Sequence, residues 1–154
     1  MGAKLQSNIG ADADEKSVGR LLALDLGARR VGVAVCDELR LTVRPLDAIE
    51  RRSWKDLLRR VVDQIENFGA AGLVIGLPLN IDGSEGEASR HARDVADKFR
   101  LSIKLPVYLQ DERLTTEEAK SQLRASGKAL EIDQRVDSEA AAIILRDFIS
   151  RERS

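Results

Sequence analysis

The chain has 154 residues, a net charge of −1 and 33% charged residues. This length suits a single domain, and no apolar run approaches the roughly 20 residues that a membrane-spanning helix needs. A single cysteine and a single histidine exclude an internal disulfide and a metal site built on those residue types, and the lone thiol fits a reducing cytoplasm.

Residues 1–18 are polar and aperiodic, which predicts a flexible tail before one folded domain over residues 19–154. Two short apolar runs follow, Leu21–Leu26 and Val31–Cys36. The four-residue turn between them predicts an antiparallel hairpin. A third strand is expected over Leu41–Ile49, at the edge of the sheet, because it contains a proline that cannot donate a ladder hydrogen bond.

Helices and strands alternate in the rest of the chain. Helical spacing of apolar residues predicts four helices: Ser53 to Phe68, Ala88–Arg100, Thr115 to near Gly127, and Asp137 or Ser138 onward. Two further apolar runs predict strands: Gly72–Leu77 and Val107–Gln110. Polar loops are expected over Pro78–Glu87 and Lys128–Val136. The order β-β-β-α-β-α-β-α-α is typical of an α/β fold with a five-stranded mixed sheet and helices on both faces.

Asp25 lies inside an apolar strand that ends at Gly27. Burying a carboxylate without a partner is costly, so this residue needs a cation, a partner or the exposed end of the strand. Ligand sites in open sheets form at the carboxyl ends of strands, which favours a functional role. The alternative is a cap on the turn or an ion pair with Arg29 or Arg30.

Asp111 and Glu112 end the predicted strand at residues 107–110. Neighbouring residues of a strand face opposite ways, so only one of the two can face the same centre as Asp25. On residue type alone, Asp111 is equally consistent with a capping or solvated residue. Glu112 is equally consistent with an ordinary surface glutamate.

Asp137, at the expected start of the last helix, is also typical of an N-cap, and Asp133 is a competing candidate. Three carboxylates without His or Cys ligands suit a hard divalent ion such as Mg²⁺ or Mn²⁺. Two such ions about 3.5–4 Å apart can activate water and stabilise the leaving oxygen in phosphodiester hydrolysis. With 26 acidic residues in the chain, spacing alone leaves other triples open.

Four segments are spread along the chain between Leu21 and Phe148, which is nearly the whole chain after the tail: DLGARRVGVAVCD, GLPLNIDGSEG, DERLTT and VDSEAAAIIL. In this order they resemble the signature blocks of the YqgF/RuvX family. The resemblance implies an RNase H-like fold and a metal-dependent nuclease, tied in bacteria to 5′-end maturation of pre-16S ribosomal RNA and named for the resolution of Holliday junctions. Carried over by motif, Asp25, Glu112 and Asp137 would be the acidic triad that holds the metal.

Candidate phosphate-binding residues follow from position beside the first and fifth strands. Arg113 adjoins Glu112 and suits a phosphate, although an ion pair with Glu117 or Glu118 is equally consistent. Arg30 follows Arg29 in the turn after the first strand, and we expect one of these two arginines to contact a nucleic-acid backbone.

The loop after the fourth strand and the segment before the last helix supply the other candidates. Backbone amides around Asn80 and Ser84, ahead of a helix, predict a phosphate cradle. An ordinary loop, with Ser84 and Glu87 capping the helix, is the alternative. Lys128 is a further phosphate candidate before Asp137.

Three functions compete. The first is a nuclease that acts on ribosomal RNA precursor, within a pre-ribosomal particle or free of it, or on branched DNA. The second is a catalytically silent nucleic-acid-binding module on the same fold, which would tolerate Asp25→Asn. The third is a phosphotransferase of the actin type, which the DLG segment and hairpin also resemble, but such enzymes need two domains. The near-neutral charge favours nucleic-acid binding by a local arginine patch.

Overall fold

The computed structural model describes residues 18–113 and 129–154, with the backbone alone over residues 129–137. Within these ranges five strands form one sheet: β1 (Leu21–Leu26), β2 (Arg30–Cys36), β3 (Val43–Glu50), β4 (Gly72–Leu79) and β5 (Val107–Arg113). The helices of the same ranges are α2 (Trp54–Phe68), α3 (Glu87–Ser102) and α5 (Ala129–Glu152). None of these helices combines the length and apolarity that crossing a membrane requires.

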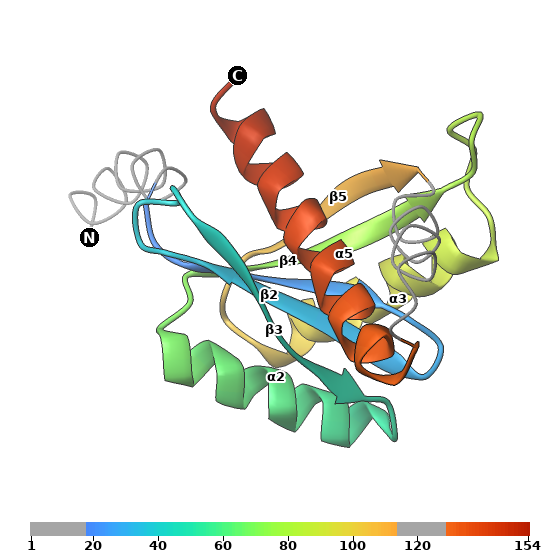
Figure 1. The fold of residues 1–154 in the computed structure, drawn as a ribbon, viewed down its shortest axis with the longest axis horizontal. Helices are drawn as coiled ribbons and strands as arrows, with labels where there is room; N and C mark the ends of the chain where they lie inside the picture. Colours follow the sequence, from blue (N-terminus) through green and yellow to red (C-terminus); the bar gives the residue numbers. More distant parts are fainter. Residues whose placement is uncertain (1–17, 114–128) are drawn as a thin grey trace.

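The sheet is mixed, with strand order β3-β2-β1-β4-β5 (Figure 1). The neighbours β1, β2 and β3 are antiparallel, whereas β1, β4 and β5 run parallel. The predicted hairpin, the edge position of β3 with its Pro45, and the α/β class are therefore confirmed. The parallel arrangement brings the carboxyl ends of β1, β4 and β5 to one edge of the sheet.

Two hydrophobic layers lie on opposite faces of this sheet. Along β1, Leu22 and Leu24 enter one layer, and Leu21 and Ala23 enter the other. The first layer is completed by α2 and α3, through Leu57, Val61, Val95 and Phe99 among others. The second is completed by α5, through Ala141, Ala142, Ile144, Leu145 and Ile149. Helices thus cover both faces, as predicted, with α5 crossing the sheet opposite α2 and α3 (Figure 1).

The ends of α2 follow the local sequence. Ser53 accepts the backbone N–H of Asp56 at 3.1 Å, which satisfies one donor of the first turn. Gly69 ends the helix at φ +62°, a conformation that glycine adopts without steric cost. The Asp56 carboxylate accepts hydrogen bonds from Arg59 and Arg60 instead of closing a reciprocal capping box.

Two strands are longer than predicted. β4 continues to Leu79, because Pro78 and Leu79 pair with Glu112 and Arg113 of β5. Pro78 lies beyond the part of β4 that pairs with β1, which ends at Ile75, so its missing N–H costs no bond to β1. The loop therefore begins at Asn80, and both acids of β5 belong to the strand.

The prediction that Asp137 or Ser138 begins the last helix is wrong, because α5 is already helical from Ala129. The expected loop over Lys128–Val136 contains several good helix formers, namely Lys128, Ala129, Leu130, Glu131, Gln134 and Arg135. Asp137 is accordingly an interior residue of α5 and not an N-cap. The helix expected from Thr115, Lys128 itself and residues 1–17 lie outside the described residues.

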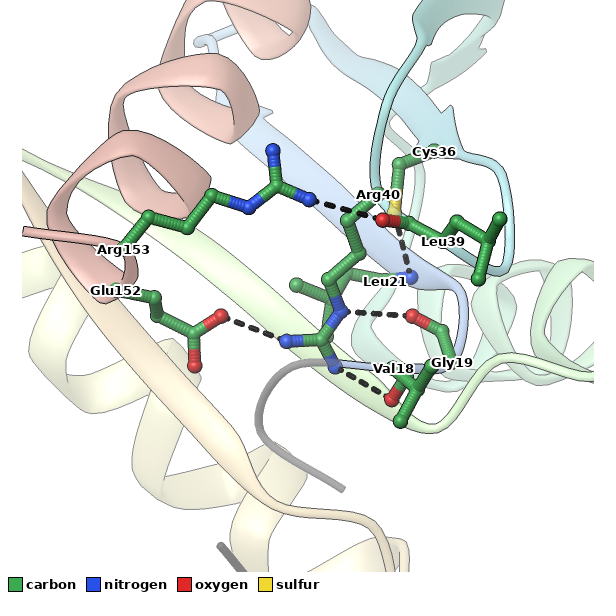
Figure 2. Close-up of polar contacts among 8 residues, drawn as sticks. All are labelled: Val18, Gly19, Leu21, Cys36, Leu39, Arg40, Glu152 and Arg153. Carbon is green, nitrogen blue, oxygen red and sulfur yellow. Dashed lines mark hydrogen bonds and ion pairs between the residues drawn. The ribbon is translucent and has the colours of Figure 1, made fainter. Parts of the chain in front are cut away.

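A buried arginine joins the two ends of the described chain (Figure 2). Arg40, in the turn after β2, has a φ of +57° and a side chain only 4% exposed. Its Nε donates to the Gly19 carbonyl at 2.8 Å and its Nη2 to the Val18 carbonyl at 3.1 Å. Its Nη1 pairs with Glu152 at 2.6 Å, near the end of α5. The contact lies at the amino end of β1, away from Asp25.

Candidate active site

Asp25 and Glu112 lie on the same face of the sheet, at the edge where parallel strands end. Asp25 alternates with Ala23, which packs under α5, and it is level with Gly76 of β4. Glu112 alternates with Tyr108, which packs against the same layer. The register β1–β4–β5 therefore directs both carboxylates to the α5 side at the carboxyl edge.

Asp111 faces the other way, toward α3. It alternates with Leu109, which packs in the α2–α3 layer. The pKa of Arg93 on α3 is raised mainly by Glu85 and to a smaller extent by the charge of Asp111. Of the two neighbouring acids at the end of β5, Glu112 is thus the one that shares a face with Asp25.

The two carboxylates are half-buried and offer oxygen atoms suited to a hard cation. Oδ2 of Asp25 and Oε1 of Glu112 are enclosed by protein and accept no hydrogen bond within the described residues. Both residues nevertheless interact with other parts of the protein. Carboxylate oxygens are the ligand atoms that a hard divalent ion prefers, so two carboxylates on one face suit such an ion.

Helix α5 packs closely over this edge of the sheet. A Cβ on Gly76 would stand 2.5 Å from Cδ1 of Ile144, so a larger residue in β4 would force this buried side chain of α5 to move. Farther along the sheet, Val33 donates its backbone N–H to Oγ of Ser138 at 3.3 Å. The bond lies where the β2–β3 register shifts, one residue from the partner of Asp25 on β2.

Asp137 directly precedes Ser138 on α5, which places its backbone next to the contact between α5 and β2. It is four residues before Ala141 and seven before Ile144, which both enter the layer under α5. Its side chain lies outside the described part of the structure. Among the described residues no three acidic, histidine or cysteine side chains form a metal-binding group, so the role of Asp137 as a third ligand stays a prediction.

The loop from Asn80 to Gly86 is held by hydrogen bonds among its own residues. Asn80 donates from Nδ2 to Oγ of Ser84 at 3.0 Å, and Ser84 donates to the Asp82 carboxylate at 2.6 Å. Backbone N–H groups of Asn80, Gly83 and Ser84 are also used within the loop. These bonds from Ser84, with a smaller contribution from the Arg113 charge, hold the pKa of Asp82 below its usual range. A phosphate at this loop would therefore meet side chains rather than these amides.

Arg113 lies with this loop rather than beside the two carboxylates. It follows Glu112 on β5 and therefore faces the α3 side. Its guanidinium Nη2 lies 2.8 Å from the position that a Cβ on Gly83 would occupy. Glycine at this position, with φ +86°, leaves room for the guanidinium.

Arg30 lies on the opposite side of the site, at the start of β2. It alternates with Gly32 and Ala34, so it shares the α5 face with Asp25. Its carbonyl accepts the N–H of Gly27 at 3.0 Å and thereby closes the turn after β1. The structure thus brings Asp25, Glu112 and Arg30 to one face and keeps Arg113 with Asn80 and Ser84 on the other.

Two residues at this site were not selected from the sequence. Gln110 is 4% exposed, is level with Gly76 on the α5 face, and donates to the Asp111 carbonyl at 3.2 Å. The sequence signal for Gln110 was its position two residues before Glu112, which places both side chains on the same face of a strand. Ser138 was seen only as an alternative helix cap, because its bond to β2 joins positions 105 residues apart.

The family model described as "RuvX: Holliday junction resolvase" matches residues 19–151. A protein of Anaeromyxobacter sp. (strain Fw109-5) named "Putative pre-16S rRNA nuclease" is 43% identical over 131 residues, which cover 84% of this chain and 96% of the relative. A protein of the same name from Rickettsia bellii (strain OSU 85-389) is 36% identical, over 84% of this chain and 85% of the relative.

Among solved structures, T. thermophilus RuvC in complex with a Holliday junction substrate is similar in fold. Its TM-score is 0.53 at 14% sequence identity, over 88% of this chain and 97% of that chain. At this identity the similarity concerns the fold, which is the RNase H-like α/β architecture expected from the motifs.

Proposed function

The chain belongs to the RuvX family of Holliday junction resolvases, and from that premise we propose that it is a metal-dependent nuclease whose metal is held by Asp25, Glu112 and Asp137. The observation that carries this proposal is the placement of Asp25 and Glu112 on one face at the carboxyl edge of the sheet. The position of Asp137 on α5, next to the Ser138 contact with β2, supports it as the third ligand.

Mg²⁺ or Mn²⁺ is the cofactor that such a set of oxygen donors would hold, with two ions as the proposed arrangement. When bound, the metal supplies Lewis acidity that makes a water nucleophilic and stabilises charge on the phosphate. Asp25 and Glu112 contribute negative charge in a half-buried environment, where electrostatic interactions are less screened than in water. Their repulsion without a cation favours metal binding.

Arg30 is proposed to contact the substrate backbone on the α5 face, next to Asp25. Arg113, with Asn80 and Ser84, is proposed to contact phosphate on the other side of the edge. Lys128 remains a candidate from its place in the sequence. A guanidinium pairs with a phosphate through two parallel N–H donors, which would orient the strand before hydrolysis.

Ribosomal RNA precursor is the substrate that we propose, since the name of the similar curated proteins specifies pre-16S rRNA. We propose the cytoplasm as the compartment of this activity and a pre-ribosomal particle as a further partner. The family description favours a second candidate substrate, the four-way DNA junction.

The test is cleavage of two end-labelled substrates, pre-16S rRNA and a four-way DNA junction, with Mg²⁺ or Mn²⁺. The protein is expected to cut at least one of them, and Asp25→Asn is expected to lose turnover while it stays folded. Cleavage by Asp25→Asn at the unsubstituted rate would overturn the proposed site. Binding without metal-dependent cleavage by the unsubstituted protein would favour a silent nucleic-acid-binding module.

A further inference from the structure

A hollow of about 510 Å³ opens beside the turn that follows Asp25. It is lined by this turn, the end of β3, the segment that follows β3, and one residue of α2. Five of its lining residues are arginines and one is acidic: Arg29, Arg30, Arg51, Arg52, Arg60 and Glu50. We define these residues as the arginine hollow.

Arg51 fixes one wall of the arginine hollow. Its Nη1 donates to the Gly27 carbonyl at 2.9 Å, and its Nη2 contacts Nε2 of His91 at 2.7 Å. A guanidinium can only donate, so Nε2 of His91 is the acceptor in this contact. The Arg51 N–H also donates to the Arg29 carbonyl at 2.8 Å. These bonds tie the turn after β1 to α3 and hold the wall in place.

Arg29 and Arg52 leave donors available for a ligand. Arg29 is exposed and makes no side-chain hydrogen bond or ion pair with any described residue. Arg52 reaches Glu50 only at 3.8 Å, and their side chains are 59% and 70% exposed. Such an exposed and distant pair adds little stability, so it would yield readily to a better anion.

Gathering so many like charges in one hollow is unfavourable unless an anion offsets their repulsion. Arg60 is offset by Asp56, at 3.0 Å. Glu50 is the single acid of the lining. A phosphodiester matches the donors of Arg29 and Arg52 in charge and in planar, bidentate geometry.

We propose that the arginine hollow binds the phosphate backbone of the nucleic-acid substrate at a position flanking the bond that is cut. This inference rests on the proposed nuclease function. Asp25 and the hollow are joined by the turn over residues 27–29, so one strand of nucleic acid can cross both. With a chain of net charge −1, a local patch of this kind must supply most of the electrostatic attraction.

The test measures binding of a fluorescent pre-16S rRNA fragment and a labelled four-way DNA junction to the full chain in EDTA, where no cleavage occurs. The variants are Arg29→Gln and Arg52→Gln, whose exposed side chains can be changed without loss of the fold. The matched control is Arg146→Gln on α5, which removes the same charge from a half-exposed side chain outside the hollow.

Each hollow variant is expected to weaken binding of at least one probe by about threefold or more, and to flatten the slope of log K against log salt by about 0.7–0.9 per lost phosphate contact. In cleavage assays with metal, KM should rise while kcat stays unchanged, because the lost contact stabilises the bound substrate and the transition state equally. Arg146→Gln should behave as the unsubstituted protein, and polyglutamate should not displace the probe.

Unchanged affinity in both hollow variants would overturn the proposal, as would equal losses in Arg146→Gln. Displacement by polyglutamate at equal charge would also overturn it, since the hollow would then respond to anionic chains in general. These results are separate from the proposed function, because loss of turnover in Asp25→Asn tests the nuclease site and needs no change in affinity.

Discussion

Oγ of Ser138 accepts the backbone N–H of Val33 at 3.3 Å, across 105 residues of sequence. Val33 lies beside Gly32, the partner of Asp25 on β2, at the point where the β2–β3 pairing shifts register. The bond therefore positions α5, and with it the backbone of Asp137, relative to Asp25. It links the fold of the sheet to the geometry of the proposed site.

Ser138→Ala should lower the free energy of unfolding by about 1–3 kcal/mol, because the buried Val33 N–H would lose its acceptor. Urea denaturation measures this loss. Ser150→Ala, an exposed position on the same helix, is the control and should change stability little. Equal stability of the two variants would show that the Ser138 bond contributes nothing to holding α5.

Gly76→Ala should destabilise the protein by about 1–3 kcal/mol, because the new methyl group would collide with Ile144 and push α5 from β4. Ile144→Val removes the Cδ1 atom that stands 2.5 Å from the methyl position. The double variant should therefore be more stable than the sum of the single effects predicts, by at least about 0.5 kcal/mol. Strict additivity in thermal or urea unfolding would contradict this packing.

Arg40→Lys should cost about 3 kcal/mol of stability, because one ammonium cannot make all three of the guanidinium hydrogen bonds to Gly19, Val18 and Glu152 (Figure 2). Arg44→Lys, exposed on β3, serves as the control for the same exchange. Thermal unfolding compares the two. A loss at Arg40 no larger than at Arg44 would mean that this contact does not hold the chain ends.

Cys36 should react slowly with iodoacetamide in the native protein. Its Sγ is buried and accepts the Leu21 N–H at 3.2 Å, and burial raises the pKa of the thiol. Because the folded pKa exceeds the unfolded one, this group's contribution to stability is complete below the unfolded pKa and declines as pH rises through the folded one. The rate of iodoacetamide labelling, measured before and after denaturation, checks the predicted slow reaction. Comparable rates in the native and the denatured protein would contradict the burial of Cys36.

Much of the fold could be predicted from local patterns. Short apolar runs predicted the strands, and Ser53 with Gly69 marked the ends of α2. The start of α5 could not be predicted, because residues 128–136 mix polar and apolar side chains and no capping residue marks where the helix begins.

The candidate site, like the fold, could be predicted only in part from the sequence. The motif resemblance selected Asp25 and Glu112, and strand alternation left the choice between Glu112 and Asp111 open until the register was known. The bond from Val33 to Ser138 and the arginine hollow depend on residues far apart in sequence. Such contacts arise only when the sheet has assembled, so no local pattern encodes them.

The most direct test compares Glu112→Gln with Asp111→Asn, neighbouring acids on opposite faces of β5. Metal-dependent cleavage of pre-16S rRNA or a four-way junction is measured for both, after circular dichroism verifies the fold. Glu112→Gln should lose about a hundredfold or more of kcat, as loss of an electrostatic group at the reacting centre does, while Asp111→Asn should stay near the unsubstituted rate. Equal rates for both variants, or the larger loss in Asp111→Asn, would contradict the proposed metal site.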